Sequence, residues 1–348
     1  MFTERTEVTM KLTRSHRTVC AGVGLAITVV VAAAPAARAD GGGDTLAAVS
    51  AATPDTVAAA AAVPTTSAGE TAIDATLDGT DVTVPVDPAN GITIASEQNS
   101  VSIDLPFAAD AEDATVERRG VVAYDNGNGS TTVPVVRHDG SVQINTVIED
   151  SSAPTRYEYV LELPAGVVIQ EAGGTLLLVA ADGSLVGGVA PSWAKDARGS
   201  DVASRYEVNG KMITQVIEHD DRYVYPVVGD PWIGMNLFGA MSKDTFNGKP
   251  KYSGVLSAWG TSVYSGLAQG GGIGAAAAGQ AILRDAGWTE WKSRLVGSNP
   301  AATLKQQYDC HVAGGYAVWL SGAHWDLEAA RSSNPNWLNN VFGHKCNW

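Results

Sequence analysis

Four titratable side chains in the C-terminal part of the chain have the types that acid–base chemistry needs. They lie among tryptophans and are His311, His324, Asp326 and Glu328. Imidazole and carboxylate groups are the side chains that most often move protons in catalysis. The sequence has no Gly-x-Ser-x-Gly, His-Glu-x-x-His or catalytic Cys-His signature that would support them. They are therefore weak catalytic candidates.

A structural role explains these residues more simply. The stretch "WDLEAAR" predicts a short helix from Asp326 to Arg331, in which the Asp326 carboxylate lies at the positive end of the helix. Glu328 and Arg331 are then spaced for a surface ion pair. We expect structural roles for all four candidates, and we predict neither a cofactor nor a bound metal.

Two cysteines in this part of the chain, Cys310 and Cys346, have histidines beside them. Thiolate and imidazole both bind zinc, so Cys310, His311, His344 and Cys346 form one possible metal site. Neighbouring residues on a helix point about 100° apart, however, and His-x-Cys is not a usual ligand spacing. In an exported protein an even pair of cysteines is normally oxidised. We therefore predict a Cys310–Cys346 disulfide.

A glycine-rich stretch, "QGGGIGAAAAGQAIL", contains the spacing Gly272-x-Gly274-x-x-Ala277. This is a degenerate form of the dinucleotide fingerprint, which follows a strand and opens a helix in a βαβ unit. The region before it has a helical pattern, so close helix packing or a loop is the better explanation. A membrane-inserting segment is a third interpretation, because small residues also line helix contacts in bilayers.

The first 39 residues have the layout of a secretory signal peptide. A basic region precedes an apolar core from Val19 to Ala34, and "ARA" forms a small-x-small cleavage site that ends at Ala39. The core is shorter than the roughly 20 apolar residues of a membrane-spanning helix. The sequence therefore predicts export with cleavage after Ala39, and no membrane span afterwards.

The chain is acidic, with a formal net charge of −14. Cleavage after Ala39 would remove more basic than acidic residues and leave it more acidic still. Such a surface repels nucleic acid and anionic membranes, so neither is expected as a partner. We expect an extracellular or cell-envelope partner instead.

Composition divides the rest of the chain into three parts. Residues 40–72 are rich in Ala, Thr and Pro without a sustained apolar period, which predicts a disordered linker. Residues 73–231 contain short alternating valine-rich runs separated by turn residues, which predicts an antiparallel β-sandwich or an open barrel. The pair Asn209-Gly210 between two such runs predicts a hairpin with a type I′ turn.

The stretch "RYVYPVVGDPWIG" marks the predicted end of the β-domain. Arg222 to Val228 reads as a last strand, with Pro226 at an edge position because proline cannot donate to a ladder. Asp230 and Pro231 have the types that cap and open a helix. A helix beginning at Trp232, with its indole largely buried at the junction, is therefore expected.

Residues 232–348 contain eight of the nine tryptophans and have mainly helical patterns. Helices are expected over 253–267, 273–285 with a possible extension to 295, 300–319 and 326–331. The predicted fold is therefore α+β and multidomain: an antiparallel β-sandwich-like domain followed by a small, mainly helical, disulfide-closed module.

Two regions of the sequence resemble a known group of proteins. The segment from Gly183 to Trp232, together with Cys310, "WDLEAAR" and Cys346, is similar to secreted actinobacterial proteins that end in a domain of unknown function, number 2599. The resemblance implies a signal peptide, a β-rich region and a C-terminal module containing Trp and Cys. It implies no activity, cofactor or catalytic residue.

The function expected from the sequence is non-enzymatic binding at the cell surface or in the extracellular medium. A secreted hydrolase that acts on the cell wall through His324, Asp326 or Glu328 is the alternative. A secreted membrane-active toxin that uses the Gly/Ala segment is the third hypothesis.

Overall fold

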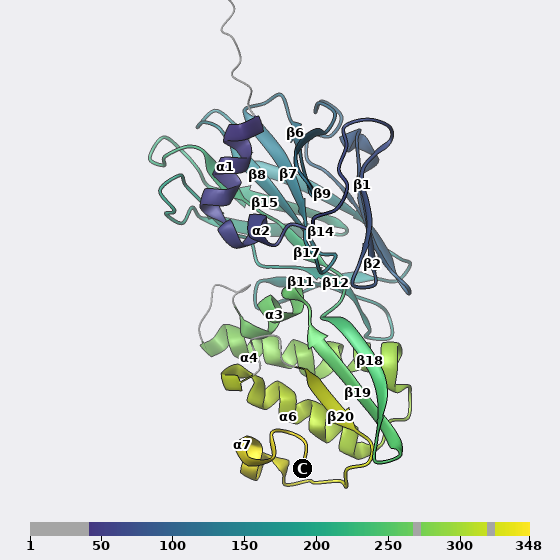
Figure 1. Cartoon of the computed structure of the whole chain (residues 1–348). Coiled ribbons are helices and arrows are strands. Elements are labelled where there is room, and N and C mark those ends of the chain that lie inside the picture. The colour runs from purple at the N-terminus through teal and green to yellow at the C-terminus, as the bar shows by residue number, and fades with distance from the viewer. Residues whose placement is uncertain (1–41, 267–272, 319–323) are drawn as a thin grey trace, which may run out of the picture. The chain divides into compact units, whose positions relative to one another are not determined.

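The computed structural model describes residues 42–266, 273–318 and 324–348 (Figure 1). The predicted signal peptide and Gly272 lie outside these residues. The described part from residue 42 onward belongs to one compact unit. Two antiparallel sheets, a smaller third sheet and several helices make up this unit.

The first sheet has seven strands, each antiparallel to its neighbours. Its order is β1 (Thr71–Leu77), β2 (Thr80–Pro85), β3 (Ile92–Ser96), β4 (Ser100–Asp104), β9 (Arg156–Glu162), β15 (Met212–Ile217) and β14 (Ser204–Asn209). A 3-10 turn, Pro88–Asn90, joins β2 and β3. In β9 the side chains alternate strictly between buried and exposed, because one face of the sheet is in the core and the other meets water.

The second sheet has ten strands and is also antiparallel. Its main path is β10 (Val168–Ala172), β11 (Thr175–Val179), β12 (Leu185–Val189), β17 (Trp232–Gly234), β8 (Val142–Ile148), β7 (Ser130–Val136), β6 (Val121–Asp125) and β5 (Thr115–Arg118), with β16 (Val227–Gly229) joining β8 to β13 (Ala194–Lys195). One hydrophobic core takes Ile94 and Leu161 from the first sheet and Ile144 and Leu178 from the second. The predicted antiparallel, sandwich-like domain is confirmed.

Residues 40–72 were expected to form a disordered linker, and that prediction is wrong for much of the segment. Helices α1 (Gly42–Ala52) and α2 (Pro54–Ala58) lie beside β7 and β8 (Figure 1). Val49 and Val57 are buried in a second core with valines of the ten-stranded sheet. The alanine-rich sequence therefore folds because it covers an outer sheet face that would otherwise expose valines.

The predicted hairpin at Asn209-Gly210 is confirmed, although its turn differs from the expected one. Asn209 pairs with Met212, so Gly210 and Lys211 are the two loop residues. Gly210 has a φ of 61°, and Lys211 is not among the positive-φ residues. A positive φ at the first loop position alone is the pattern of a type II′ turn.

The stretch after Arg222 differs from its prediction. The strand β16 begins only at Val227, and Pro226 precedes it after a cis peptide bond. No helix begins at Trp232, because Trp232–Gly234 forms β17 between β8 and β12. The ten-stranded sheet therefore continues past the predicted boundary at residue 231.

The C-terminal module combines helices with a three-stranded antiparallel sheet that the sequence patterns missed. The sheet contains β18 (Phe238–Phe246), β19 (Lys249–Leu256) and β20 (Trp325–Glu328). The expected helices over 273–295 and 300–319 are present as α4 (Ile273–Ile282) with its extension through Val296, and as α6 (Ala302–Val318). The extension consists of a π-helical turn Leu283–Gly287, α5 (Trp288–Trp291) and a second π-helical turn Lys292–Val296. The expected helix over 253–267 is shorter, as α3 (Ala258–Ser265).

The expected helix from Asp326 to Arg331 does not form. Its first residues lie in β20, which pairs with β19. The chain ends with a 3-10 turn, Trp337–Asn340, and α7 (Val341–His344). The predicted disulfide is present, with 5.4 Å between the Cα atoms of Cys310 and Cys346, and it ties α6 to the end of the chain.

Strand β11 lies between the core of the sandwich and the core of the C-terminal module. Leu176 and Leu178 lie in the core of the sandwich, whereas Leu177 lies in the core of the C-terminal module. Side chains alternate between the two faces of a strand, so the run "TLLLV" is apolar on both faces because both are covered. The large aromatics of the module, including Phe238, Trp291 and Trp325, form the core of the C-terminal module.

Among the described helices, none has the length and apolar character needed to cross a bilayer. Helix α4, which includes much of the Gly/Ala segment, packs closely on α3: a Cβ added to Gly279 would lie 2.0 Å from the carbonyl oxygen of Val263. Close helix packing, as expected from the sequence, therefore explains this glycine. Helix α3 also precedes it where a dinucleotide site would need a strand.

Candidate functional site

His311 is part of the protein core. Its ring is 2 % exposed and stacks on Trp325, with 5.6 Å between the ring centroids. Its Nε2 lies 3.2 Å from the carbonyl oxygen of Asp326. Burial lowers the pKa of His311 to about 4, which keeps the imidazole neutral at physiological pH. These contacts give His311 a packing role between α6 and β20.

The two candidate carboxylates belong to β20 and have separate partners. Asp326 accepts a hydrogen bond of 2.5 Å from the hydroxyl of Ser253, and Lys251 Nζ lies 3.0 Å from its carboxylate. Glu328 is buried and forms the predicted ion pair with Arg331. His324 is exposed just before the strand. Neither of the two pockets described below is lined by any of the four candidates.

The alternative zinc site is not formed, because Cys310 and Cys346 are bonded to each other. His344 contacts local backbone groups: its Nε2 lies 2.8 Å from the carbonyl oxygen of Trp337, and its Nδ1 accepts the N–H of Cys346 at 3.0 Å. Within the described ranges, no three His, Cys, Asp or Glu side chains gather closely enough to hold a metal ion.

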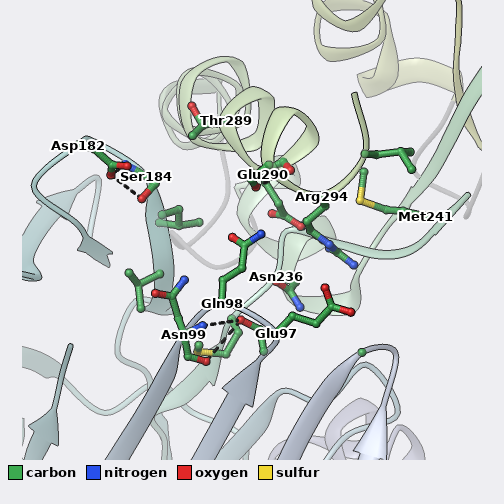
Figure 2. A pocket seen from close by; sticks show the side chains of 17 residues that line it. Glu97, Gln98, Asn99, Asp182, Ser184, Asn236, Met241, Thr289, Glu290 and Arg294 are labelled. Atoms are coloured by element: carbon green, nitrogen blue, oxygen red, sulfur yellow. Dashed lines mark hydrogen bonds and ion pairs between the residues drawn. The ribbon is translucent and has the colours of Figure 1, made fainter. Parts of the chain in front are cut away.

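A polar pocket of about 340 Å³ is the first candidate binding site, and Figure 2 shows it from close by. Its walls include three parts of the chain that are distant in sequence: the β3–β4 turn with Glu97, Gln98 and Asn99, the β11–β12 turn with Asp182 and Ser184, and the helical segment with Glu290 and Arg294. The volume lies within the range of small-ligand sites. No sequence motif predicted this pocket, because its residues come together only in the folded chain.

Glu290 and Arg294 form the back wall of this pocket and are already engaged. Glu290 accepts the backbone N–H groups of Leu237 at 2.8 Å and Phe238 at 3.1 Å. Its carboxylate also pairs with Arg294 at 2.6 Å. Burial raises the pKa of Glu290, and the Arg294 charge acts against that rise. This pair holds the start of β18 against the helical segment and so fixes the shape of the wall.

The opposite wall carries polar groups that are available to a ligand. Glu97 and Gln98 are exposed, and within the described residues the structure records no hydrogen bond for either side chain. In Figure 2 the side chain of Gln98 points from the β3–β4 turn toward the helix that carries Glu290. Met235 and Met241 add adaptable apolar surface to the lining. With Glu97 and Asp182 at its rim, the pocket favours a polar ligand that is neutral or positively charged.

A second pocket, of about 420 Å³, lies beside Arg137 and is lined by Trp193 and Trp232. Trp232 was expected to be largely buried, but it is only half-buried because part of its indole faces this pocket. Its Nε1 donates to the hydroxyl of Ser141 at 2.9 Å, which fixes the indole in place.

Asp230 does not cap a helix as the sequence suggested. It is fully buried, and its Oδ1 accepts the N–H of Trp193 at 3.0 Å and Nε2 of Gln215 at 3.1 Å. Burial raises the pKa of this carboxyl well above its usual range, and its hydrogen bonds only partly oppose that rise. Asp230 therefore joins β15 and the β12–β13 connection inside the sandwich.

The chain matches no protein-family model and no curated protein. The functional argument therefore depends on the geometry of its own residues.

Proposed function

We propose that this protein is exported and acts as a non-enzymatic binding protein, with the pocket of Figure 2 as its recognition site. The observation that carries the proposal is a difference between the two pocket walls: one is engaged in structural contacts, and the other has polar side chains without partners among the described residues. The charged pair at the back is occupied in holding the fold, while the exposed Glu97 and Gln98 face the pocket without partners among the described residues. Such a site is suited to holding a ligand by hydrogen bonds.

The expected ligand is an extracellular or cell-envelope component with hydrogen-bonding groups and a neutral or positive charge. The carboxylates at the rim of this pocket disfavour anionic ligands at this site. The methionines provide a surface that adapts to an aliphatic or backbone segment. A polypeptide segment with a basic side chain fits these features. The signal-peptide pattern and the resemblance to secreted actinobacterial proteins support the extracellular setting.

A pull-down with residues 40–348 tests the proposal against cell-envelope fractions and culture supernatant. Glu97→Lys reverses a charge at the rim, and Gln98→Trp fills part of the pocket. Because both residues are exposed, the two variants should stay folded and lose the captured component. Glu162→Lys makes the same charge change at an exposed end of β9 outside the pocket and should retain it.

Capture that survives both pocket variants would exclude this site. Soluble fragments released from purified cell wall by the wild-type protein would instead support the hydrolase hypothesis. In that case the same release assay on three variants tests whether the predicted residues carry the hydrolase activity. The variants are His324→Ala, Asp326→Asn and Glu328→Gln.

A further inference from the structure

The second pocket lies where α2 and α3 meet the ten-stranded sheet. Arg137, which directly follows β7, contributes to its lining together with Trp193 and Trp232. The side chain of Arg137 is inside the protein, with 8 % of the residue exposed. An arginine this deeply buried normally has a carboxylate or several strong acceptors around its guanidinium.

Arg137 has few such partners. Its Nε is buried and has no acceptor among the described residues. Its Nη1 has only long contacts, at 3.4 Å to the hydroxyl of Thr56 and 3.5 Å to Oε1 of Gln143. In the part of the chain that the structure describes, no carboxylate oxygen lies within 4.0 Å of the guanidinium.

The two neutral acceptors near Arg137 also bond to each other. The hydroxyl of Thr56 already donates to Oε1 of Gln143 at 2.5 Å. A guanidinium keeps its proton inside proteins. The charges of Asp139 and Asp55 favour that charged form from a distance, but neither carboxylate pairs directly with Arg137. A carboxylate is the group whose two oxygens match the fork of an arginine.

The indoles beside Arg137 provide a surface of a different kind. The guanidinium carbon lies 4.4 Å from the centre of the Trp232 ring. This contact holds the charge over one indole, and the hydrogen bond from Trp232 to Ser141 fixes that indole in turn. Aromatic faces that line a pocket bind the apolar face of a ring-shaped ligand.

Hydroxyl and carboxylate groups complete the lining on the helical side. Thr261 and Ser262 come from α3, and the exposed Asp55 comes from α2. These groups are acceptors and donors for ligand hydroxyls. The charge of Asp55 also disfavours a ligand with several negative charges, which points to a single carboxylate on a hydroxylated ring.

We propose that this pocket binds a uronic acid, either free or as a residue of an acidic polysaccharide. Its carboxylate pairs with Arg137, its ring lies against an indole and its hydroxyls bond to the helical side. The assignment depends on residues separate from those of Figure 2, so it does not rest on the function proposed there.

Calorimetric titration of residues 40–348 with D-galacturonate, D-galactose and acetate tests this assignment. We expect saturable binding of galacturonate, with galactose and acetate each at least about tenfold weaker, because each lacks one recognition element. Galactose binding as tightly as galacturonate would overturn the role of the carboxylate. Acetate binding as tightly would overturn recognition of the ring. No saturation by about 10 mM galacturonate would overturn the site.

Variants connect the binding to the pocket. Arg137→Met removes the charge and should weaken galacturonate binding at least about tenfold, whereas Arg119→Met removes an exposed positive charge elsewhere and should not. Thr261→Trp fills the pocket without touching Arg137 and should abolish binding at an unchanged melting temperature. This second variant decides the question if Arg137→Met fails to fold. Unchanged binding in either folded variant would overturn the proposal.

Discussion

The indole of Trp259 occupies the space that a side chain at Gly234 would need. A Cβ placed on Gly234 would lie 2.6 Å from Cγ of Trp259, and one on Gly188 would lie 2.9 Å from Cζ2 of the same ring. Gly188 and Gly234 are paired residues of β12 and β17. The tryptophan of α3 therefore rests directly on the backbone of the sandwich, and the backbone N–H of Trp259 donates to Asp139 at 3.0 Å.

We expect Gly234→Ala to destabilise the protein by about 1–3 kcal/mol, because the added methyl forces the buried indole or the strand to move. Urea unfolding monitored by tryptophan fluorescence measures the change. Gly239→Ala is the matched control, since its nearest neighbour would be a side-chain oxygen of Asp78 at 3.2 Å. Equal stability of the two variants would show that the contact with Trp259 is not tight.

Removing the disulfide should destabilise the protein substantially. The Cys310–Cys346 bond closes a loop with a sequence separation of 36, for which the chain-entropy model gives about 4 kcal/mol. The double variant Cys310→Ser and Cys346→Ser should therefore unfold at lower urea concentration. Mass spectrometry with and without reductant checks the linkage first; two free thiols in protein purified under oxidising conditions would contradict it.

Asp230 should make the protein less stable as the pH rises. Its folded pKa lies above its unfolded value of about 3.8, so the folded state holds a proton that the unfolded state releases. This loss of stability begins near pH 3.8 and continues until the folded pKa is reached. Asp230→Asn stays neutral throughout, so it should be more stable than the wild type at pH 7, and the difference should shrink toward pH 4.

Urea unfolding at pH 4, 5.5 and 7 measures that difference. Asp113→Asn changes an exposed carboxylate and serves as the control. A gap between wild type and Asp230→Asn that stays constant with pH would exclude the buried carboxyl as its source.

His311 should have the opposite effect on stability, between about pH 4 and pH 6.5. Burial lowers its pKa to about 4, below the ordinary value of 6.5, so the unfolded state takes up a proton before the folded state does. Stability from this residue is complete above about pH 6.5 and falls by up to about 3 kcal/mol as the pH falls to 4. His311→Gln should flatten this part of the stability profile, as measured by thermal unfolding at several pH values. An unchanged profile would contradict it.

The sandwich could be predicted because its strands carry their own pattern. The alternation in Arg156–Glu162 and the turn glycine at Gly210 are local signals, and both correspond to observed elements. The strand Trp325–Glu328 has no such signal. Four residues are too few for a period, and its partner β19 lies more than 70 residues earlier in the chain. Its acidic residues resembled a helix start, which is why a helix was expected there.

The two pockets were beyond prediction for a related reason. Gln98 and Glu290 come together only because the sandwich and the C-terminal module meet at that point. The sequence around Arg137 does not distinguish it from an exposed arginine that follows a strand. Its burial depends on α2, and the composition of that segment had predicted disorder. The neighbours of these residues were therefore set by contacts over long sequence distances, which local patterns do not show.

Because both faces of β11 are buried, incomplete chains of this protein should be prone to aggregation and proteolysis. A product that stops before β18 would retain every strand of the two large sheets but would present Leu177 and its neighbours on an open sheet face. Exposed apolar sheet surface promotes aggregation and recognition by proteases. Incomplete chains should therefore aggregate or be degraded, so that only the full-length protein accumulates.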